Sequence, residues 1–156
     1  EINMTKFDIV KAASEVEETF EVLNQQEGYN ITFSKCRSAY VYGDYDKLKQ
    51  VMANLISNAV KYCGEDRYIH IELKKVGRSV RFDVIDHGDG IAAEEISHVW
   101  ERYYRTSANR NRNIEGTGLG LSIVKGILSL HNANYGVESE EGKGSDFWFE
   151  LNTVRK

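Results

Sequence analysis

The sequence predicts an α+β fold, a two-layer sandwich in which a mixed, mostly antiparallel sheet carries helices on one of its faces. Three observations predict it. Strand patterns with alternating apolar residues occur in pairs joined by short turns, helical patterns with one apolar face separate them, and no internal repeat or linker divides the 156 residues. Apolar residues make up 41% of the chain, which is enough for a single domain over 1–156 with a sizeable core.

The first part of the chain is expected to hold short strands and one helix. A strand over 6–9 leads into a helix over about 10–25, because apolar residues then recur at helical spacing. Two further strands are expected in YNITFSK (29–35) and AYVYGD (39–44). The helix is expected to pack through Val16, Phe20 and Leu23.

A long helix is expected to follow Asp44 and to run to about Tyr62, ending before Gly64. Its apolar positions recur at helical spacing and predict a core face made of Leu48, Val51, Met52, Leu55 and Ala59. After it, RYIHIELKKVGRSVRFDVID (67–86) alternates apolar and polar residues on both sides of a turn near Gly77, which predicts a hairpin.

The last part combines a long loop, a helix and a second hairpin. No periodicity is found over 101–115, and a loop of that length inside a compact domain is usually functional or disordered. YGVESEEGKGSDFWFEL (135–151) predicts the hairpin. The helix between them begins near Leu119 and is expected to bury Leu119, Ile123, Val124, Ile127 and Leu128.

Charge and composition argue against several classes of function. The formal net charge is −4, which does not favour binding to DNA or to an anionic membrane. No apolar run approaches the roughly 20 residues of a membrane-spanning helix, and no signal peptide is expected at the start of the chain. Cys36 and Cys63 lack metal-type spacing and are expected to be free thiols.

A stripe of amide side chains follows the long helix. Gln50, Asn54, Asn58 and Lys61 are separated by four, four and three residues, which places them together on a face apart from the core. A solvated face is one explanation, but asparagine in mid-helix costs about half a kcal/mol relative to alanine. Amide oxygens suit Mg²⁺, and a lysine can meet a phosphate as a point charge. The stripe is thus a candidate wall of a metal and phosphate site.

An acidic residue stands where the first hairpin ends. VRFDVIDHGDGI (80–91) leads a strand into Asp86, followed by Gly88 and Gly90, and a turn alone could explain these residues. Asp86 can instead accept a hydrogen bond from an exocyclic amine, which adenine offers and which guanine replaces with a carbonyl. The two glycines would let the backbone approach a planar ligand closely.

Three glycines precede the last helix, in EGTGLGLSIVKGILSLH (115–131). Gly116, Gly118 and Gly120 leave the N–H groups at the helix start unobstructed, and Thr117 adds a hydroxyl. This predicts an anion site, most simply for phosphate, with a flexible hinge as the alternative. Neither the P-loop nor the dinucleotide-binding fingerprint fits the spacing.

Taken in order, these motifs resemble the ATP-binding catalytic domain of bacterial sensor histidine kinases, within the gyrase, chaperone, kinase and MutL ATP-binding superfamily. NLISNAVKY is similar to the family's asparagine box, DHGDG to its first glycine box, WERYYR to its phenylalanine box, GTGLGLSIVK to its second glycine box and SEEGKGSDFWFEL to its closing hairpin. The resemblance covers about 7–151. It implies the Bergerat ATP-binding fold, ATP and Mg²⁺ as cofactors, and phosphoryl transfer to a histidine.

The resemblance implies a role for each matching residue. Asn58 would bind Mg²⁺, Asp86 would select adenine, and Arg105, with Arg102 as a second candidate, would reach the γ-phosphate as charge moves during transfer. Residues 91–115 would form a mobile lid. The implied catalytic residues are Asn54, Lys61 and Arg105. The implied nucleotide site comprises Asn54, Asn58, Lys61, Tyr62, Asp86, Gly88, Gly90, Ile91, Tyr104, Arg105, Gly116, Thr117, Gly118, Leu119, Gly120 and Leu121.

The chain departs from the family pattern at two positions. Trp100 stands where phenylalanine is usual, and this larger ring is still expected to plug the hinge of the lid. Asp146 stands where threonine is commoner, and it is expected to be exposed at an edge of the sheet and tolerant of substitution.

The resemblance also implies what the chain itself does not supply. A sensor kinase phosphorylates its own histidine in a histidine–acid–x–x–x–proline setting, and a chain without proline has none. We therefore expect a monomeric catalytic domain that phosphorylates upstream dimerisation helices, with a response regulator as the further partner. The whole protein is expected to be a membrane-anchored bacterial sensor with this domain in the cytoplasm. The histidines so examined are His70, His87, His98 and His131.

Other functions remain open. A free-standing serine kinase of the anti-sigma-factor type would fit the length, but such kinases carry a glutamate where this chain has Asn54, and an amide cannot act as a general base. A non-catalytic nucleotide-binding module is the second alternative. Nucleic-acid binding through RYYRTSANRNR (102–112), with its interleaved Tyr103 and Tyr104, is disfavoured by the negative net charge.

Overall fold

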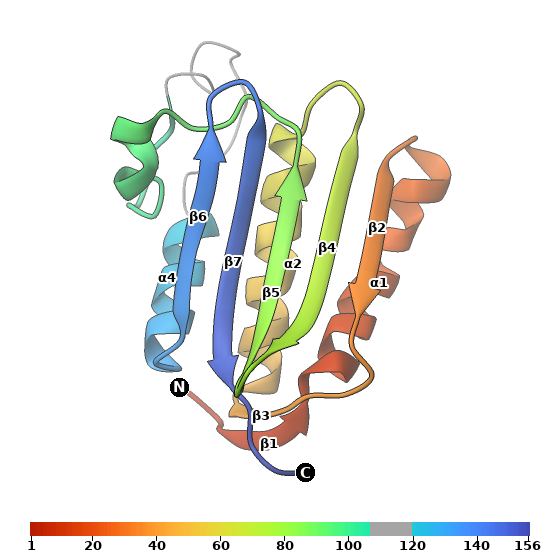
Figure 1. The fold of residues 1–156 in the computed structure, drawn as a ribbon, viewed down its shortest axis with the longest axis vertical. Coiled ribbons are helices and arrows are strands. Elements are labelled where there is room, and N and C mark those ends of the chain that lie inside the picture. The colour runs from red at the N-terminus through yellow and green to blue at the C-terminus, as the bar shows by residue number, and fades with distance from the viewer. Residues whose placement is uncertain (107–119) are drawn as a thin grey trace.

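The structure is a computed structural model that describes residues 1–106 and 120–156. Figure 1 shows the described elements as two layers, with α1, α2 and α4 on one side of a twisted sheet. The predicted α+β sandwich is therefore confirmed. In chain order the elements are β1 (Thr5–Asp8), α1 (Ile9–Gln26), β2 (Asn30–Lys35), β3 (Tyr40–Gly43), α2 (Tyr45–Tyr62), β4 (Tyr68–Val76), β5 (Ser79–Asp86), the 3-10 helix η1 (Ala93–His98), α4 (Gly120–Leu130), β6 (Asn134–Glu140) and β7 (Gly144–Asn152).

The main sheet has the strand order β2–β4–β5–β7–β6. Strand β2 runs parallel to β4, and the other neighbours are antiparallel, as the sequence predicted. Strands β1 and β3 pair separately as a short antiparallel ribbon near the lower end of the view in Figure 1. Because β7 pairs with β5 on one side and β6 on the other, its residues belong to the interior of the sheet.

Aspartates begin the two long helices. The side chain of Asp8 accepts a hydrogen bond from the N–H of Val10 at 3.0 Å, and that of Asp44 accepts one from Lys47 at 3.1 Å. Each carboxylate thereby pairs a backbone donor that the first helical turn leaves without a partner. These caps explain why α1 and α2 start within one residue of the predicted positions.

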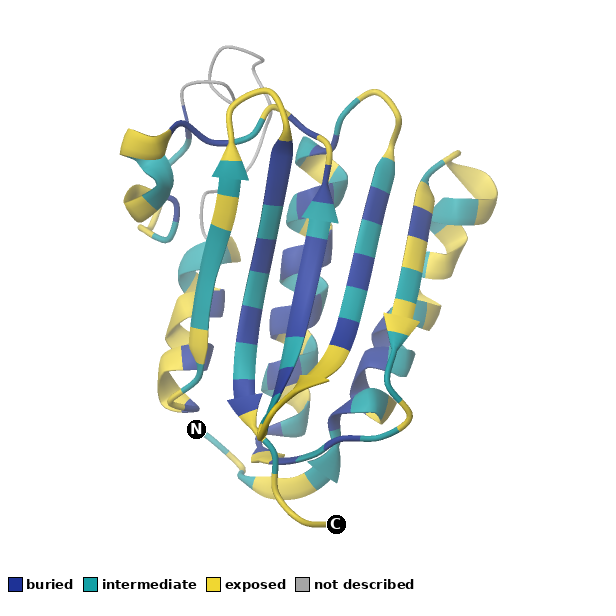
Figure 2. Cartoon of the chain, in the orientation of Figure 1, coloured by how far each residue is buried: buried dark blue, intermediate teal, exposed yellow. Residues whose placement is uncertain are grey.

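The hydrophobic core lies between the helices and the inward face of the sheet (Figure 2). Strand β4 supplies Ile69, Ile71 and Leu73 at alternate positions, all nearly fully buried. The rings of Phe82 and Phe149 pack in the core with centroids 5.3 Å apart. The predicted core face of α2 is confirmed, since burial is nearly complete for Leu48, Val51, Met52, Leu55 and Ala59.

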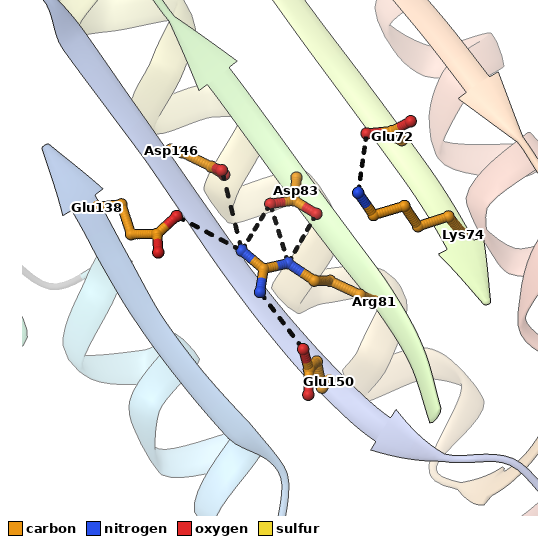
Figure 3. Close-up of polar contacts among 7 residues, drawn as sticks. All are labelled: Glu72, Lys74, Arg81, Asp83, Glu138, Asp146 and Glu150. Carbon is orange, nitrogen blue, oxygen red and sulfur yellow. Dashed lines mark hydrogen bonds and ion pairs between the residues drawn. The ribbon is translucent and has the colours of Figure 1, made fainter. Parts of the chain in front are cut away.

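No described helix covers the outward face of the sheet (Figure 1). On this face the guanidinium of Arg81 is surrounded by carboxylates (Figure 3). Its Nε lies 3.0 Å from Oδ1 of the buried Asp83, and its carbon lies 4.3 Å from the centre of the Trp148 ring. The other acidic partners, with their N–O distances, are Glu150 at 3.3 Å, Glu138 at 3.7 Å and Asp146 at 3.9 Å.

The expectation that Asp146 is exposed at a sheet edge is wrong. Its strand has a neighbour on each side, and only 23% of its side chain is exposed. Burial, together with the neighbouring carboxyl of Asp83, raises the pKa of Asp146 to about 8. Its Oδ1 is buried and has no hydrogen-bond partner in the described part of the chain. Asp146 therefore lies inside the sheet, close to other charged side chains.

Helix α4 buries a narrower face than predicted. Val124, Ile127 and Leu128 are buried, but Ile123 is 39% exposed, so its predicted place in the core is wrong. At about 100° per residue, Ile123 lies beyond the arc that the three buried residues span. Leu119 lies outside the described residues. Among the described helices, none is both long and apolar enough to span a membrane.

The segment predicted to form a lid begins with more regular structure than expected. Helix η1 lies within it, and the ring of Trp100 packs edge-on against Tyr135 of β6 and Phe147 of β7, with centroids 4.9 and 5.6 Å away. Trp100 thus packs this segment against the sheet, and its role at the hinge of a lid stays a prediction. Residues 107–115 of the segment lie outside the described residues.

Candidate functional site

A cavity of about 250 Å³ lies among α2, the loop after β5, the segment after η1 and the start of α4. These elements are far apart in the sequence, and the fold brings them together at one end of the helical layer (Figure 1). The predicted site residues that line the cavity are Asn54, Asn58, Lys61, Tyr62, Asp86, Gly90, Ile91, Tyr104, Arg105, Gly120 and Leu121.

Helix α2 forms one wall with its predicted amide stripe. Asn54, Asn58 and Lys61 all line the cavity, because one turn of helix separates each from the next. Gln50 belongs to the same stripe but lies a further turn towards the helix start, and it does not line the cavity. Three of the four residues of the predicted stripe therefore line the cavity.

Asp86 brings a carboxylate into the cavity from the end of β5. The residue is 5% exposed, and its Oδ1 accepts a hydrogen bond from the N–H of Gly88 at 2.8 Å. Burial raises the pKa of Asp86 to about 6, although the backbone N–H groups of Gly88 and Ser145 act in the opposite direction by favouring the charged form. A carboxylate can accept more hydrogen bonds than these, and a ligand in the cavity could donate a further one.

Gly88 and Gly90 allow the loop after Asp86 to pass very close to other backbone. A Cβ on Gly88 would lie 1.9 Å from the carbonyl oxygen of Tyr62, and one on Gly90 would lie 2.1 Å from that of Glu140. Gly90 also has φ 72°, which L side chains rarely adopt. Gly90 lines the cavity and Gly88 does not, so for Gly88 the close approach is to the end of α2.

The segment after η1 forms the wall that includes Tyr104 and Arg105. Both side chains are half-buried, and Thr106, the next residue, is 6% exposed. Arg105 and Lys61 therefore give the cavity two cationic side chains from different elements.

The start of α4 contributes Gly120 and Leu121. The remaining residues predicted for this part of the site, Gly116, Thr117, Gly118 and Leu119, lie outside the described residues. The first described turn of α4 nevertheless faces the cavity, as expected if a helix N-terminus forms part of the site.

Several cavity residues were not identified from the sequence. Ser145 and Phe147 continue the inward-facing alternation of β7, so the strand period could have indicated them. Ser57 lies three residues after Asn54 and four before Lys61, so the helical period of the stripe could have indicated it. Val99 and Thr106 carry no such signal, because their place depends on how the segment around η1 folds. Asp89 follows the predicted acid by three residues and also lines the cavity.

The arrangement offers distinct chemistry from different elements. The end of β5 presents a buried carboxylate, α2 presents two neutral amides, and Lys61 and Arg105 present positive charge. Within residues 1–106 and 120–156, no group of three or more histidine, cysteine, aspartate or glutamate side chains is placed to hold a metal ion. Among the described residues that line the cavity, Asn54 and Asn58 offer amide oxygens and Asp86 and Asp89 offer carboxylates that could hold a cation.

Residues 43–155 match the family model described as histidine kinase-, DNA gyrase B-, and HSP90-like ATPase. The match covers α2, the end of β5, the segment after η1 and α4, which are the elements that line the cavity. The chain belongs to this ATPase family. The resemblance drawn from the sequence motifs is thereby confirmed, and the fold is the one that this family shares.

Curated relatives of this ATPase domain are bacterial sensor proteins. The phosphate regulon sensor protein PhoR of Haemophilus influenzae is 34% identical over 144 residues, which cover 92% of this chain and 34% of PhoR. The sensor histidine kinase WalK of Bacillus subtilis is 34% identical over 153 residues, which cover 97% of this chain and 25% of WalK. The chain therefore spans about a quarter to a third of the length of these two relatives.

Solved structures of histidine kinases share the fold. The nucleotide-free catalytic domain of ThkA is 28% identical with a TM-score of 0.83, covering 98% of this chain and 99% of that one. Full-length ShkA in complex with AMPPNP is 26% identical with a TM-score of 0.83, covering 100% and 32%. ThkA in complex with the response regulator protein TrrA is 26% identical with a TM-score of 0.80, covering 98% and 42%.

Proposed function

We propose that residues 1–156 form the catalytic and ATP-binding domain of a sensor histidine kinase, which binds Mg-ATP and transfers the γ-phosphoryl group to a histidine of an acceptor domain. The observation that carries the proposal is that Asp86 and Asn58, from different elements, line the same cavity. Membership of the ATPase family and the likeness to the AMPPNP complex of ShkA support a nucleotide as the ligand.

Asp86 is proposed to recognise the amine of adenine. Its pKa of about 6 leaves the carboxylate mainly ionised at pH 7.5, and its buried position makes an unmatched ligand group costly. An ionised carboxylate accepts a hydrogen bond from an amine and repels the carbonyl that guanine has at the same place. We therefore expect ATP to be preferred over GTP. Gly90 and Ile91 flank this carboxylate in the cavity wall, with Gly88 behind them.

Asn58 is proposed to give an amide oxygen to Mg²⁺, with Asn54 one turn before it. Neutral amide oxygens are hard ligands, and Mg²⁺ commonly combines few protein ligands with phosphate oxygens and water. Lys61 and Arg105 are proposed to bind the phosphates, Arg105 nearest the γ-phosphate. Asn54, Lys61 and Arg105 thus remain the proposed catalytic residues. The rest of the proposed nucleotide site comprises Tyr62, Tyr104, Gly116, Thr117, Gly118, Leu119, Gly120 and Leu121.

Histidine is the proposed acceptor because of what stands at position 54. Bound ATP supplies the phosphoryl group, and the enzyme's part in such a transfer is mostly positioning and charge stabilisation. A serine hydroxyl or a water molecule must also lose a proton, and the amide of Asn54 cannot accept one at neutral pH. A histidine nitrogen already carries a lone pair and needs no such base.

The longer protein is proposed to supply the remaining parts of a two-component system. It would contain dimerisation helices with the phosphoacceptor histidine, and a membrane anchor that leaves this domain in the cytoplasm. A response regulator would be the next acceptor of the phosphoryl group. The sensor proteins among the relatives and the complex of ThkA with TrrA support these partners.

Two measurements test the proposal. Isothermal titration of the chain with ATP and GTP, with and without Mg²⁺, should give tighter binding of ATP and a gain with Mg²⁺ that Asn58→Ala removes. Equal affinity for ATP and GTP would contradict the role of Asp86. Radiolabelled ATP, with a separately supplied dimerisation domain, should give an acid-labile label on its histidine. Label on a serine would favour the serine-kinase alternative, and ATP binding with no label would favour a non-catalytic module.

A further inference from the structure

Tyr104 is held by residues that do not themselves reach the cavity. Its hydroxyl donates a hydrogen bond of 2.6 Å to Oε1 of Glu95, and its ring stacks on the ring of His98 with centroids 5.5 Å apart and an interplanar angle of 24°. Glu95 and His98 both belong to η1, and Tyr104 lines the cavity while they do not. The contact therefore links η1 to the wall of the site.

The backbone beside this contact has a conformation that is rare for a bulky residue. Tyr103 has φ 66° and is 65% exposed, so its own side chain does not supply the reason for the conformation. A non-glycine residue in the left-handed region costs free energy and persists where its surroundings hold it. The turn at Tyr103 directs the next residue, Tyr104, back onto η1.

Two further contacts fix η1 and the segment after it. His98 Nδ1 lies 2.8 Å from Oε2 of Glu101, which orients the ring that stacks on Tyr104. Trp100, between them, is packed edge-on against Tyr135 of β6. The segment from η1 to Trp100 is thus packed against the sheet. Tyr104 contacts η1 and also lines the cavity.

We infer that Glu95 and His98 are positioning residues of the nucleotide site, which hold Tyr104 against the cavity and so set where Arg105 stands. This role presupposes the proposed function, since Arg105 matters here as a ligand of phosphate. The bond from a phenol to a carboxylate is charge-assisted and stronger than one between neutral groups. Without it, Tyr104 and the adjoining Arg105 lose one of the contacts that place them, and binding of the phosphates weakens accordingly.

The experiment compares two ligands that differ in their phosphates. Isothermal titration measures the affinity for Mg-AMPPNP and for adenosine in the wild-type chain, in Glu95→Ala and in Tyr104→Phe. Because Arg105 is proposed to bind phosphate, each variant should weaken the binding of Mg-AMPPNP by about 5- to 10-fold, and Glu95→Ala should leave the affinity for adenosine within about twofold. The double variant should be no weaker than either single variant, since both remove the same bond.

Matched variants separate this role from a general loss of structure. Glu94→Ala removes an exposed carboxylate from the same 3-10 helix and should bind both ligands as the wild type does. Glu95→Gln keeps an acceptor and should restore most of the Mg-AMPPNP affinity that Glu95→Ala loses. His98→Asn removes the stacked ring and should cost Mg-AMPPNP about two- to threefold.

Each other outcome is decisive. A wild-type chain that binds neither adenosine nor Mg-AMPPNP would overturn the proposed function itself. If the wild type and Glu94→Ala bind both ligands, and Glu95→Ala binds Mg-AMPPNP as tightly as they do, the positioning role is wrong and the proposed function stands. If Glu95→Ala weakens the binding of both ligands equally and lowers the melting temperature, the positioning role is also wrong, because a purely structural contact would have that effect.

Discussion

Two aspartates on opposite faces of the same sheet, Asp86 buried and Asp146 half-buried, show how differently one fold can use a carboxyl group. Asp86 of β5 lines the cavity on the helical side, whereas Asp146 of β7 lies on the open face beside Arg81 (Figure 3). Burial raises the pKa of both, Asp86 to about 6 and Asp146 to about 8. A raised pKa therefore does not by itself distinguish a binding site from a structural network.

What each carboxyl group faces makes the distinction. Asp86 accepts a hydrogen bond from the N–H of Gly88 and opens onto a space that holds amides and cations from other elements. Asp146 competes with Asp83, Glu138 and Glu150 for one guanidinium, and one of its oxygens has no partner among the described residues. The carboxylate of Asp86 can accept a hydrogen bond from a ligand in the cavity. Protonation of Asp146 removes its repulsion with the neighbouring carboxylates.

The largest predicted effect is on the open face. Arg81→Gln should lower the free energy of unfolding by about 3 kcal/mol, because Asp83, with 5% of its side chain exposed, would lose the charge that compensates its burial. Urea denaturation at pH 7.5 measures this. Lys74→Gln is the control, since Lys74 pairs with Glu72 at 3.6 Å on the same face but is half-exposed, and it should cost less than about 1 kcal/mol. Similar losses in the two variants would show that the network around Arg81 is an ordinary surface one.

In the cavity, Asp86→Asn should weaken the binding of ATP by about 10- to 100-fold, the usual range for losing a hydrogen bond to a charged group. Isothermal titration measures it. Asp146→Asn is the matched control on the other face and should bind ATP as the wild type does. A loss in Asp146→Asn as large as that in Asp86→Asn would remove the functional difference between the two carboxyl groups.

The pH dependence of binding separates the two groups further. With the pKa of Asp86 raised to about 6, adenosine should bind about tenfold more weakly at pH 5 than at pH 7.5, because the protonated carboxyl is a poor acceptor. Adenosine is the probe because it has no phosphate to titrate. Asp146→Asn should show the same profile and Asp86→Asn a flatter one. A flat profile in the wild type would mean that ionisation of Asp86 does not govern binding.

A smaller effect is expected on stability at high pH. The pKa of Asp146 is raised from 3.8 to about 8, so the folded state binds the proton more tightly than the unfolded state, and stability falls as pH rises between these values. Asp146→Asn, which cannot ionise, should therefore be more stable than the wild type at pH 9 and about as stable as the wild type at pH 4. Thermal unfolding at the two pH values measures the difference. A variant less stable than the wild type at pH 9 would show that the ionised carboxylate is stabilising.

Many features of the fold and of the candidate site could be predicted from the sequence, because residues close together in the chain determine them. Asp44 caps the helix that it begins, and the alternation that leads into Asp86 marks the end of a strand. The spacing of Asn54, Asn58 and Lys61 placed them on one stripe, which the structure brings to the cavity. In each case the determining residues are neighbours along the chain, so a period or a cap is enough.

The features that were predicted wrongly or missed depend on contacts between elements that are far apart in the chain. The expectation that Asp146 lies at an edge is wrong because β7, and not β6, pairs with β5, and nothing in the hairpin's own pattern indicates which strand is inside. Ile123 fits a helical apolar stripe, yet the arc of α4 that meets α2 and the sheet stops short of it. Thr106 lines the cavity, and the lack of periodicity over 101–115 leaves no local pattern that could have indicated it.

The most direct test of the account is a ¹³C NMR titration of the aspartate carboxyl groups, with and without saturating adenosine. We predict that Asp86 titrates near pH 6 in the free chain, and that its pKa falls when adenosine binds, because an amine donor favours the ionised form. Asp146 should titrate near pH 8 in both samples. A pKa of Asp86 that adenosine leaves unchanged, or a shift at Asp146 in its place, would contradict the assignment of the cavity as an adenine site.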